Sequence, residues 1–351
     1  MANTAAMTPQ QAYDARKIKM ATSGMKIALL MPFSAIVQNI FNESVTNVVA
    51  ASVSEKIIVS IICSITLVGL GDFFAGIFAF LYNGTRGIGM KEVKRTMNLK
   101  VSWMMLLAAL VAGPMATGCW MAATPFCGLT MVAVITSLGP ILTSFFSRFV
   151  LHEKLSPRVY AGIFIVVIGA IAAGWTGVSG GGTNYILGIC LALLAPIGFS
   201  LESQLSTYAG DMIDPNVGCS IFRCFGSCFW CLLTMLLLSA FTGNIGAFGL
   251  IIATSFSTPK LFIFVILMGL CGAINYNAAY LAFNRTGPSR ALAIDSSRPL
   301  WSIPCGYIFT LIGVSQYSVS GMEIIGAIIV VIGLILIISK PGDLVNLRNV
   351  D

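Results

Sequence analysis

The residues in this sequence most able to do chemistry are five charged side chains within apolar stretches, namely Asp72, Glu202, Arg223, Asp295 and Arg298. A charge at membrane depth is costly, so such a residue usually has a partner or a function. Asp295 and Arg298 are one helical turn apart, and Glu202 and Arg223 flank a short polar turn, so two ion pairs are expected. Three acids and two bases leave one negative charge in excess. A bound proton, a cationic ligand or water can balance it.

Uncharged polar and aromatic side chains at similar depth indicate a ligand cavity. Amides and hydroxyls can replace the hydration of a polar ligand, and the faces of Tyr and Trp rings attract ammonium groups. Each residue alone is better explained by a hydrogen bond between helices, which contributes about 0.6 kcal/mol. As a set they favour a cavity. The predicted substrate-binding residues are Asn39, Ser137, Glu202, Asn275, Tyr276, Tyr280, Asp295, Arg298 and Trp301.

The sequence argues against an enzyme. Its only histidine, His152, lies in a polar turn, which excludes a zinc or haem site built on histidines at membrane depth. Cys224, Cys228 and Cys231 share one helical face, a spacing that could suit a soft metal, but we interpret them as small apolar residues at a helix contact. The phosphate-binding pattern Gly-x-x-x-x-Gly-Lys is missing from the sequence. We therefore predict no catalytic residue, no metal and no cofactor.

Composition identifies the elements that must position these residues. The chain is 57% hydrophobic and 9% charged, more apolar than a soluble core requires. About twenty apolar residues in a helix cross roughly 30 Å of hydrocarbon. Ten such stretches are predicted, near 26–48, 57–82, 101–123, 126–150, 159–177, 185–207, 217–241, 261–284, 290–313 and 321–339.

The two halves of the chain resemble each other at a fixed offset of 164 residues, which places Pro140 over Pro304 and Gly162 over Gly326. Each copy holds five predicted spans, and because five is odd the copies must cross the bilayer in opposite directions. The predicted fold is an all-α integral membrane protein with ten transmembrane helices arranged as two inverted five-helix repeats. The predicted parts are an N-terminal arm at 1–25, repeats at 26–177 and 185–339 joined near 180–182, and a tail at 340–351.

Basic residues predict the orientation of the chain. Sixteen of the twenty Lys and Arg residues lie on alternate connections, whereas the opposite set holds only Lys56 and Lys260. The positive-inside rule then places both termini in the cytoplasm, with the chain in a bacterial inner membrane. The same asymmetry explains the net charge of +7, so a nucleic-acid partner is not expected.

One segment resembles a known family. Pro140, the turn Leu151-His-Glu153-Lys-Leu-Ser156 and the glycines Gly162 and Gly169 are similar to the end of the five-helix unit of the drug/metabolite transporter superfamily, of EamA-like type. The second copy departs from this pattern, because Tyr317 stands at the position equivalent to Glu153. The resemblance implies transport of small molecules, often amino acids, amines, nucleotide-sugars or drugs, and it implies export. It supplies no catalytic motif.

We therefore predict a secondary transporter that exports small polar metabolites such as amino acids or amines by alternating access. Its partners would be the substrate and the lipid bilayer, and proton coupling is one way to balance the excess acid. The sequence leaves open whether the protein is a monomer or a homodimer. The alternatives are a multidrug or organic-cation transporter and a non-transporting membrane scaffold or sensor.

Overall fold

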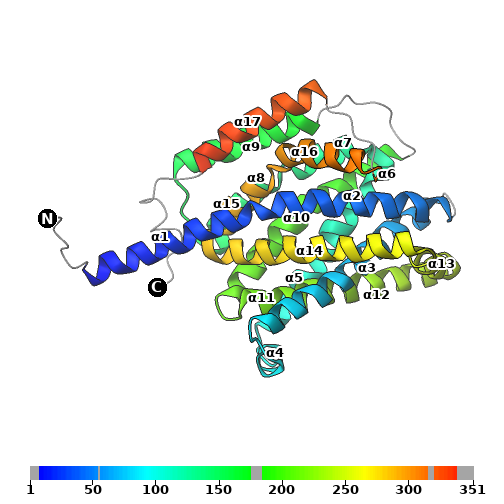
Figure 1. Cartoon of the computed structure of the whole chain (residues 1–351), viewed down its shortest axis with the longest axis horizontal. Helices are drawn as coiled ribbons and strands as arrows, with labels where there is room; N and C mark the ends of the chain where they lie inside the picture. The colour runs from blue at the N-terminus through cyan, green and yellow to red at the C-terminus, as the bar shows by residue number, and fades with distance from the viewer. Residues whose placement is uncertain (1–7, 54–55, 175–183, 315–319, 338–351) are drawn as a thin grey trace.

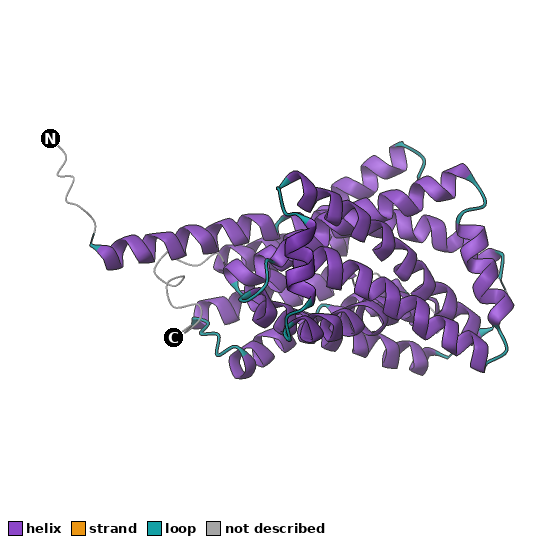
Figure 2. Ribbon diagram, turned by 90° about the horizontal axis from the view of Figure 1, so that it is seen from below, coloured by secondary structure: helices purple, strands orange, loops and turns teal. Residues whose placement is uncertain are grey.

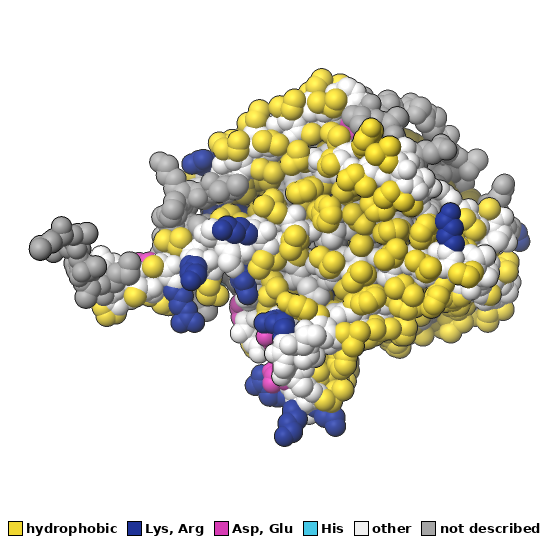
Figure 3. All heavy atoms as spheres, in the orientation of Figure 1, with side chains coloured by type: hydrophobic (Ala, Val, Ile, Leu, Met, Phe, Trp, Pro, Cys, Tyr) yellow, Lys and Arg dark blue, Asp and Glu magenta, His cyan; other side chains and the backbone are white. Residues whose placement is uncertain are grey.

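The protein is a bundle of α-helices in the computed structural model, which describes residues 8–53, 56–174, 184–314 and 320–337. No strand occurs among these described residues, so the all-helical prediction is confirmed. Most helices run side by side along the long axis of the molecule (Figures 1 and 2). Hydrophobic side chains cover the middle of the visible face, and most of its Lys and Arg side chains lie at the end from which α1 extends (Figures 1 and 3).

The first half of the chain forms five groups of helices close to the predicted spans. In chain order they are α1 (Pro9–Ala28) with α2 (Leu30–Ala51); α3 (Ile57–Thr85); α5 (Ser102–Leu110), the π-helical segment η1 (Val111–Gly118) and α6 (Cys119–Cys127); α7 (Leu129–Thr136) with α8 (Gly139–Val150); and α9 (Pro157–Gly174). The second half follows the same order with α10 (Tyr185–Gly210); α11 (Pro215–Val217), the π-helical segment η2 (Gly218–Gly226) and α12 (Ser227–Phe241); α14 (Pro259–Thr286); α15 (Pro288–Asp295) with α16 (Arg298–Leu311); and α17 (Gly321–Ile337).

Within the described chain, seven helices are long and apolar enough to cross a membrane. The fifth groups, α9 and α17, are apolar but shorter, and α15 and α16 are two short pieces. Two further helices, α4 (Met90–Met97) and α13 (Ile245–Ser255), lie in connections between the predicted spans. The predicted junction near 180–182 and the tail at 340–351 lie outside the described residues.

The predicted N-terminal arm is helical from Pro9 onward and continues into the first span. Thr8 and Gln11 form a capping box, and Pro9 occupies the first turn, where its missing N–H costs nothing. The helix is interrupted at Leu29, between α1 and α2. Pro32 explains the interruption, because it cannot donate the helical hydrogen bond to the carbonyl of Ala28.

Prolines also break the fourth group of each half. The chain leaves helical hydrogen bonding just before Pro140, between α7 and α8, and again just before Pro299, between α15 and α16. Pro304, which the repeat places over Pro140, lies inside α16, and the break precedes Pro299 instead. Pro299 has no N–H to donate to the carbonyl of Asp295 and fits the first turn of a helix, which explains the position of the break. Arg298 thereby becomes the first residue of α16.

The last helices of the two halves, α9 and α17, pack against each other through glycines at one edge of the molecule (Figure 1). A methyl group on Gly162 would meet the backbone of Gly333, and one on Gly169 would meet the backbone of Gly326. The two helices are therefore antiparallel. Exchanging each glycine for its counterpart 164 residues away converts the first pair into the second. The contact is thus symmetric with respect to the two halves.

This contact gives a test of stability. Replacing Gly326 with Ala would place a methyl group against the backbone N and Cβ of Ala173, so thermal unfolding in detergent should show a loss of about 1–3 kcal/mol. Gly321 on the same helix faces open space, and alanine there should leave stability unchanged or raise it by up to about 1 kcal/mol. Equal effects of the two substitutions would contradict close backbone packing at Gly326.

Candidate substrate site

A cavity of about 60 Å³ lies between helices of both halves of the chain. Side chains from α2, α3, the η1–α6 segment, α10, α14 and α16 surround it. Its lining residues are Ala35, Gln38, Asn39, Asn42, Val68, Gly71, Asp72, Thr117, Trp120, Met121, Phe199, Met268, Asn275, Tyr276 and Arg298. The lining is therefore mixed, with amides and two charged groups among apolar side chains.

Helix α2 contributes three of the amides. Gln38 and Asn42 are four residues apart and so share one helical face, with Asn39 beside them. The side-chain nitrogen of Gln38 donates to the Tyr276 hydroxyl at 3.2 Å, and that of Asn42 donates to the Met121 sulfur at 3.0 Å. The side-chain oxygen of Asn42 is buried and accepts no hydrogen bond from the described protein. The cavity wall thus offers an unused acceptor.

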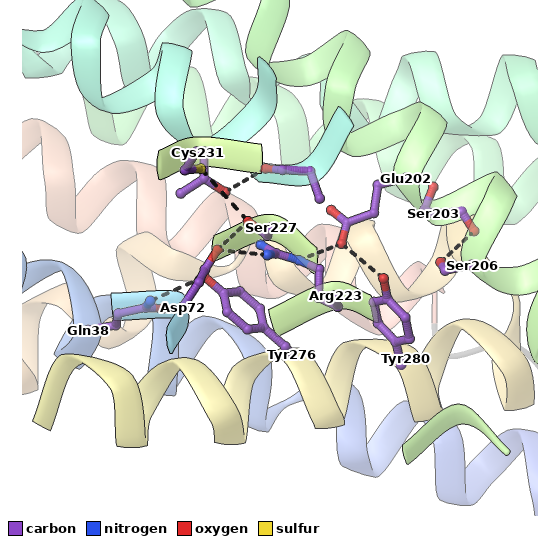
Figure 4. A network of polar contacts seen from close by, with 12 residues as sticks. Gln38, Asp72, Glu202, Ser203, Ser206, Arg223, Ser227, Cys231, Tyr276 and Tyr280 are labelled. Carbon is purple, nitrogen blue, oxygen red and sulfur yellow. Dashed lines mark hydrogen bonds and ion pairs between the residues drawn. The ribbon is translucent and has the colours of Figure 1, made fainter. Parts of the chain in front are cut away.

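Beside the cavity, Arg223 lies between two carboxylates (Figure 4). Its Nη1 donates to Oδ2 of Asp72 at 3.0 Å, and its Nε lies 2.8 Å from Oε1 of Glu202. The hydroxyl of Ser227 also donates to Oδ2 of Asp72. All three charged residues are buried. One guanidinium against two carboxylates leaves one formal negative charge in this cluster if every group is ionised.

Two tyrosines of α14 complete the cluster (Figure 4). The Arg223 guanidinium lies over the ring of Tyr276, 3.9 Å from its centre, which is a close cation–π contact. The hydroxyl of Tyr280 points to Oε1 of Glu202 at 3.5 Å. Tyr276 also lines the cavity, so it joins the cavity to the ion cluster.

The π-helical segments set the positions of these groups. Arg223 lies within η2, and Ser227 is the first residue after η2. Both side chains donate to the same oxygen of Asp72 on α3. Opposite them, Gly113 of η1 leaves room for the Ser227 side chain, which a β-carbon at that glycine would overlap. Such π-helical turns occur frequently at functional sites.

The second predicted ion pair also forms. Arg298 binds the carboxylate of Asp295, three residues earlier, across the break between α15 and α16. Arg298 lines the cavity, whereas Asp295 does not. Buried Oδ1 of Asp295 and buried Nε of Arg298 have no hydrogen-bond partner in the described protein. The guanidinium keeps donor capacity for a further group.

The structure brings most of the predicted site residues together. Four of them line the cavity, namely Asn39, Asn275, Tyr276 and Arg298. Three more stand directly behind it, Glu202 and Tyr280 in the ion cluster and Asp295 against Arg298.

The other two predicted site residues stand apart from the cavity lining. Ser137 donates its hydroxyl to the carbonyl of Val134 in its own helix. The Trp301 ring makes an edge contact with Phe33, with ring centres 5.5 Å apart, and Phe33 is exposed.

Several site residues were outside the predicted binding set. Asp72 and Arg223 were recognised as charges at membrane depth, but the sequence did not indicate that they bind each other. Asn42 could have been found from its spacing to Gln38. Among the described residues there is no group of three or more His, Cys, Asp or Glu side chains that could hold a metal ion.

Comparisons with known proteins bear on the family and the fold. Protein LicB of Haemophilus influenzae is 23% identical to this chain over 215 residues, which are 59% of this chain and 67% of LicB. A solved structure described only as the crystal structure of a protein superposes with a TM-score of 0.63 at 15% identity, covering 91% of this chain and 97% of the other. That likeness concerns the fold alone. Residues 43–175 match the model of the EamA-like transporter family, which is part of the drug/metabolite transporter superfamily.

Proposed function

We propose that this protein is a secondary transporter that exports small polar metabolites, amino acids or amines, by alternating access. The match of residues 43–175 to a family of membrane transporters for small molecules suggests the general class. The observation that carries the proposal is the polar cavity between the two halves of an apolar helical bundle. The direction of export follows only from the resemblance to the superfamily.

Several features support ten spans in two inverted repeats. The seven long helices, the apolar α9 and α17, and the broken α15–α16 segment together correspond to the ten predicted spans. Equivalent helices make equivalent contacts, since α8 packs on α10 in the same way that α16 packs on α2. Both fourth groups are discontinuous, as in many transporters that bind substrate near the bilayer midplane.

The cavity lining supports the ligand class. Asp72 and the unused oxygen of Asn42 are acceptors suited to an ammonium group, and Tyr276 offers an aromatic ring beside them. Arg298 on another wall suits a carboxylate. Pockets that bind drug-sized ligands have volumes of roughly 300–1,000 Å³. A cavity of about 60 Å³ therefore favours small metabolites over the multidrug alternative.

The ligand class can be tested by binding. Amino acids or amines should raise the melting temperature of the purified protein more than phosphorylated metabolites do at low ionic strength, where electrostatic preference is least screened. Asn275→Ala should weaken this binding about threefold to tenfold, the worth of one hydrogen bond. Asn277→Ala is the matched control, because Asn277 bonds the carbonyl of Ala273 and does not line the cavity. Tighter binding of a phosphorylated ligand would overturn the proposed class.

We further propose that protons drive transport through Glu202. Arg223 of η2, Tyr280 of α14 and, beyond Arg223, Asp72 of α3 face this carboxylate. Because the cluster holds one carboxylate more than its single guanidinium can neutralise, a proton is one species that balances it. Binding or release of this proton changes the charge of the carboxylates that hold Arg223 between α3 and α10.

Glu202→Gln should abolish uptake or efflux driven by a pH gradient in proteoliposomes, while substrate counterflow persists. The glutamine keeps the size of the side chain but cannot change its charge. Glu43→Gln on the exposed surface of α2 is the control and should retain both activities. Equal loss of both activities in Glu202→Gln would indicate a structural ion pair instead, because breaking a buried pair destabilises the fold.

We also propose that both termini are cytoplasmic and that the membrane is a bacterial inner membrane. The support is the uneven distribution of charge, with Lys91, Lys94 and Arg95 on α4 and Lys260 at the start of α14. In intact cells, a membrane-impermeant maleimide should label Lys260→Cys and not Lys94→Cys, with the parent protein as background. The opposite labelling pattern would contradict the proposed orientation.

A further inference from the structure

Helix α4 projects from the side of the bundle, toward the end from which α1 extends (Figure 1). The α3–α5 connection that contains it takes the chain sideways, whereas α1 extends beyond the bundle along its length (Figures 1 and 2). No other helix packs extensively on α4 in the described chain. Dark-blue basic side chains gather on this projection, close to the edge of the hydrophobic surface (Figure 3).

The side chains of α4 divide into two faces. Val93 and Thr96 are buried against the protein, and Met90 and Met97 lie next to them on the helix but are 55% and 59% exposed. The opposite face carries the exposed basic residues Lys91 and Arg95, with Glu92 as the one acidic residue, and exposed Lys94 lies beside Met90 at the boundary of the two faces. Exposed Leu99 and Trp103 (74% exposed) follow directly and extend the apolar side.

Specific contacts hold α4 in this orientation. The side-chain nitrogen of Asn83, at the end of α3, donates to the backbone carbonyl of Asn216 and to the hydroxyl of Ser220. The backbone carbonyl of Asn83 accepts from the backbone N–H of Ile88. On the other side, the hydroxyl of Ser102 donates to the carbonyl of Thr96. The projection is therefore fastened to the bundle at both of its ends.

We propose that α4 lies in the membrane surface and binds the headgroups of anionic phospholipids. An amphipathic helix with basic residues on one face and large apolar residues on the other is suited to the boundary between headgroups and acyl chains. Met90, Met97 and Trp103 enter the apolar side of that boundary, and Lys91 and Lys94 contact the phosphates. Arg95 contributes less, because it is already paired with Glu92.

The exposed apolar residues favour a lipid over a soluble anion. A free phosphate would use the basic side chains and leave the two methionines and Trp103 in water. The basic side chains of this projection lie close to the hydrophobic surface of the bundle, which suits a lipid because its charged headgroup is joined to apolar chains (Figure 3). The inference does not depend on which metabolite is transported.

The test uses the purified full-length protein in a neutral detergent, with short-chain phosphatidylglycerol or phosphatidylcholine added and the melting temperature recorded. Phosphatidylglycerol should stabilise the protein more than phosphatidylcholine does. In the double variant Lys91→Gln/Lys94→Gln, the half-maximal concentration of phosphatidylglycerol should rise roughly twenty- to thirtyfold, about fivefold for each basic residue. The matched control is Arg16→Gln/Lys19→Gln, which removes the same charge from exposed positions of α1 and should change nothing.

Two further measurements test whether the stabilisation comes from a lipid or from a free phosphate. Met90→Ser/Met97→Ser should also weaken the response to phosphatidylglycerol, although it alters no charge. Inorganic phosphate should not reproduce the stabilisation. Equal losses in the α4 and α1 charge variants, full stabilisation by inorganic phosphate, or an unchanged response of the methionine variant would each overturn the proposal.

Discussion

The sharing of one buried guanidinium by two carboxylates is the constraint on which the interior of this protein depends. Arg223 connects Asp72 of α3 with Glu202 of α10, and the Tyr276 ring of α14 covers it. The cluster therefore joins a helix of the first half to three segments of the second. Removing one member of such a buried pair typically costs about 3–5 kcal/mol, because the remaining charge keeps its desolvation cost without its partner. The arrangement of these four helices is thus coupled to the charge of a few side chains.

The cavity takes its chemistry from the same cluster. Asp72 and Tyr276 belong to both, so a ligand that binds in the cavity changes the electrostatic environment of Arg223 without touching it. Conversely, a change in the charge of Glu202 alters how strongly Arg223 holds Asp72. A conformational change can follow only from groups whose interaction differs between the two states. This network provides such groups at the boundary of the two halves.

The extent to which sequence predicted the structure differs from element to element. The spans followed from hydropathy, and the pairs Asp295–Arg298 and Glu202–Arg223 followed from short separations along the chain. Asp72 is 151 residues from Arg223, and only the packing of α3 against η2 brings them together. Pro299 and Pro304 were equally plausible sites for a break by chemistry alone. Helix α4 was not predicted, because it is short and its polar composition resembles that of a loop.

The π-helical geometry of η2 has a consequence for how the cluster can be undone. A π-helical turn accommodates more residues than an α-helical turn, and each residue of an α-helix adds about 100° of rotation. Rewinding Gly218–Gly226 to an α-helix would therefore turn Arg223 relative to Ser227 and the rest of α12. Because Arg223 and Ser227 are four residues apart, they share one side of the helix in either geometry. A change of register within these nine residues would therefore alter the angle at which Arg223 approaches Asp72 without unfolding α3 or α12.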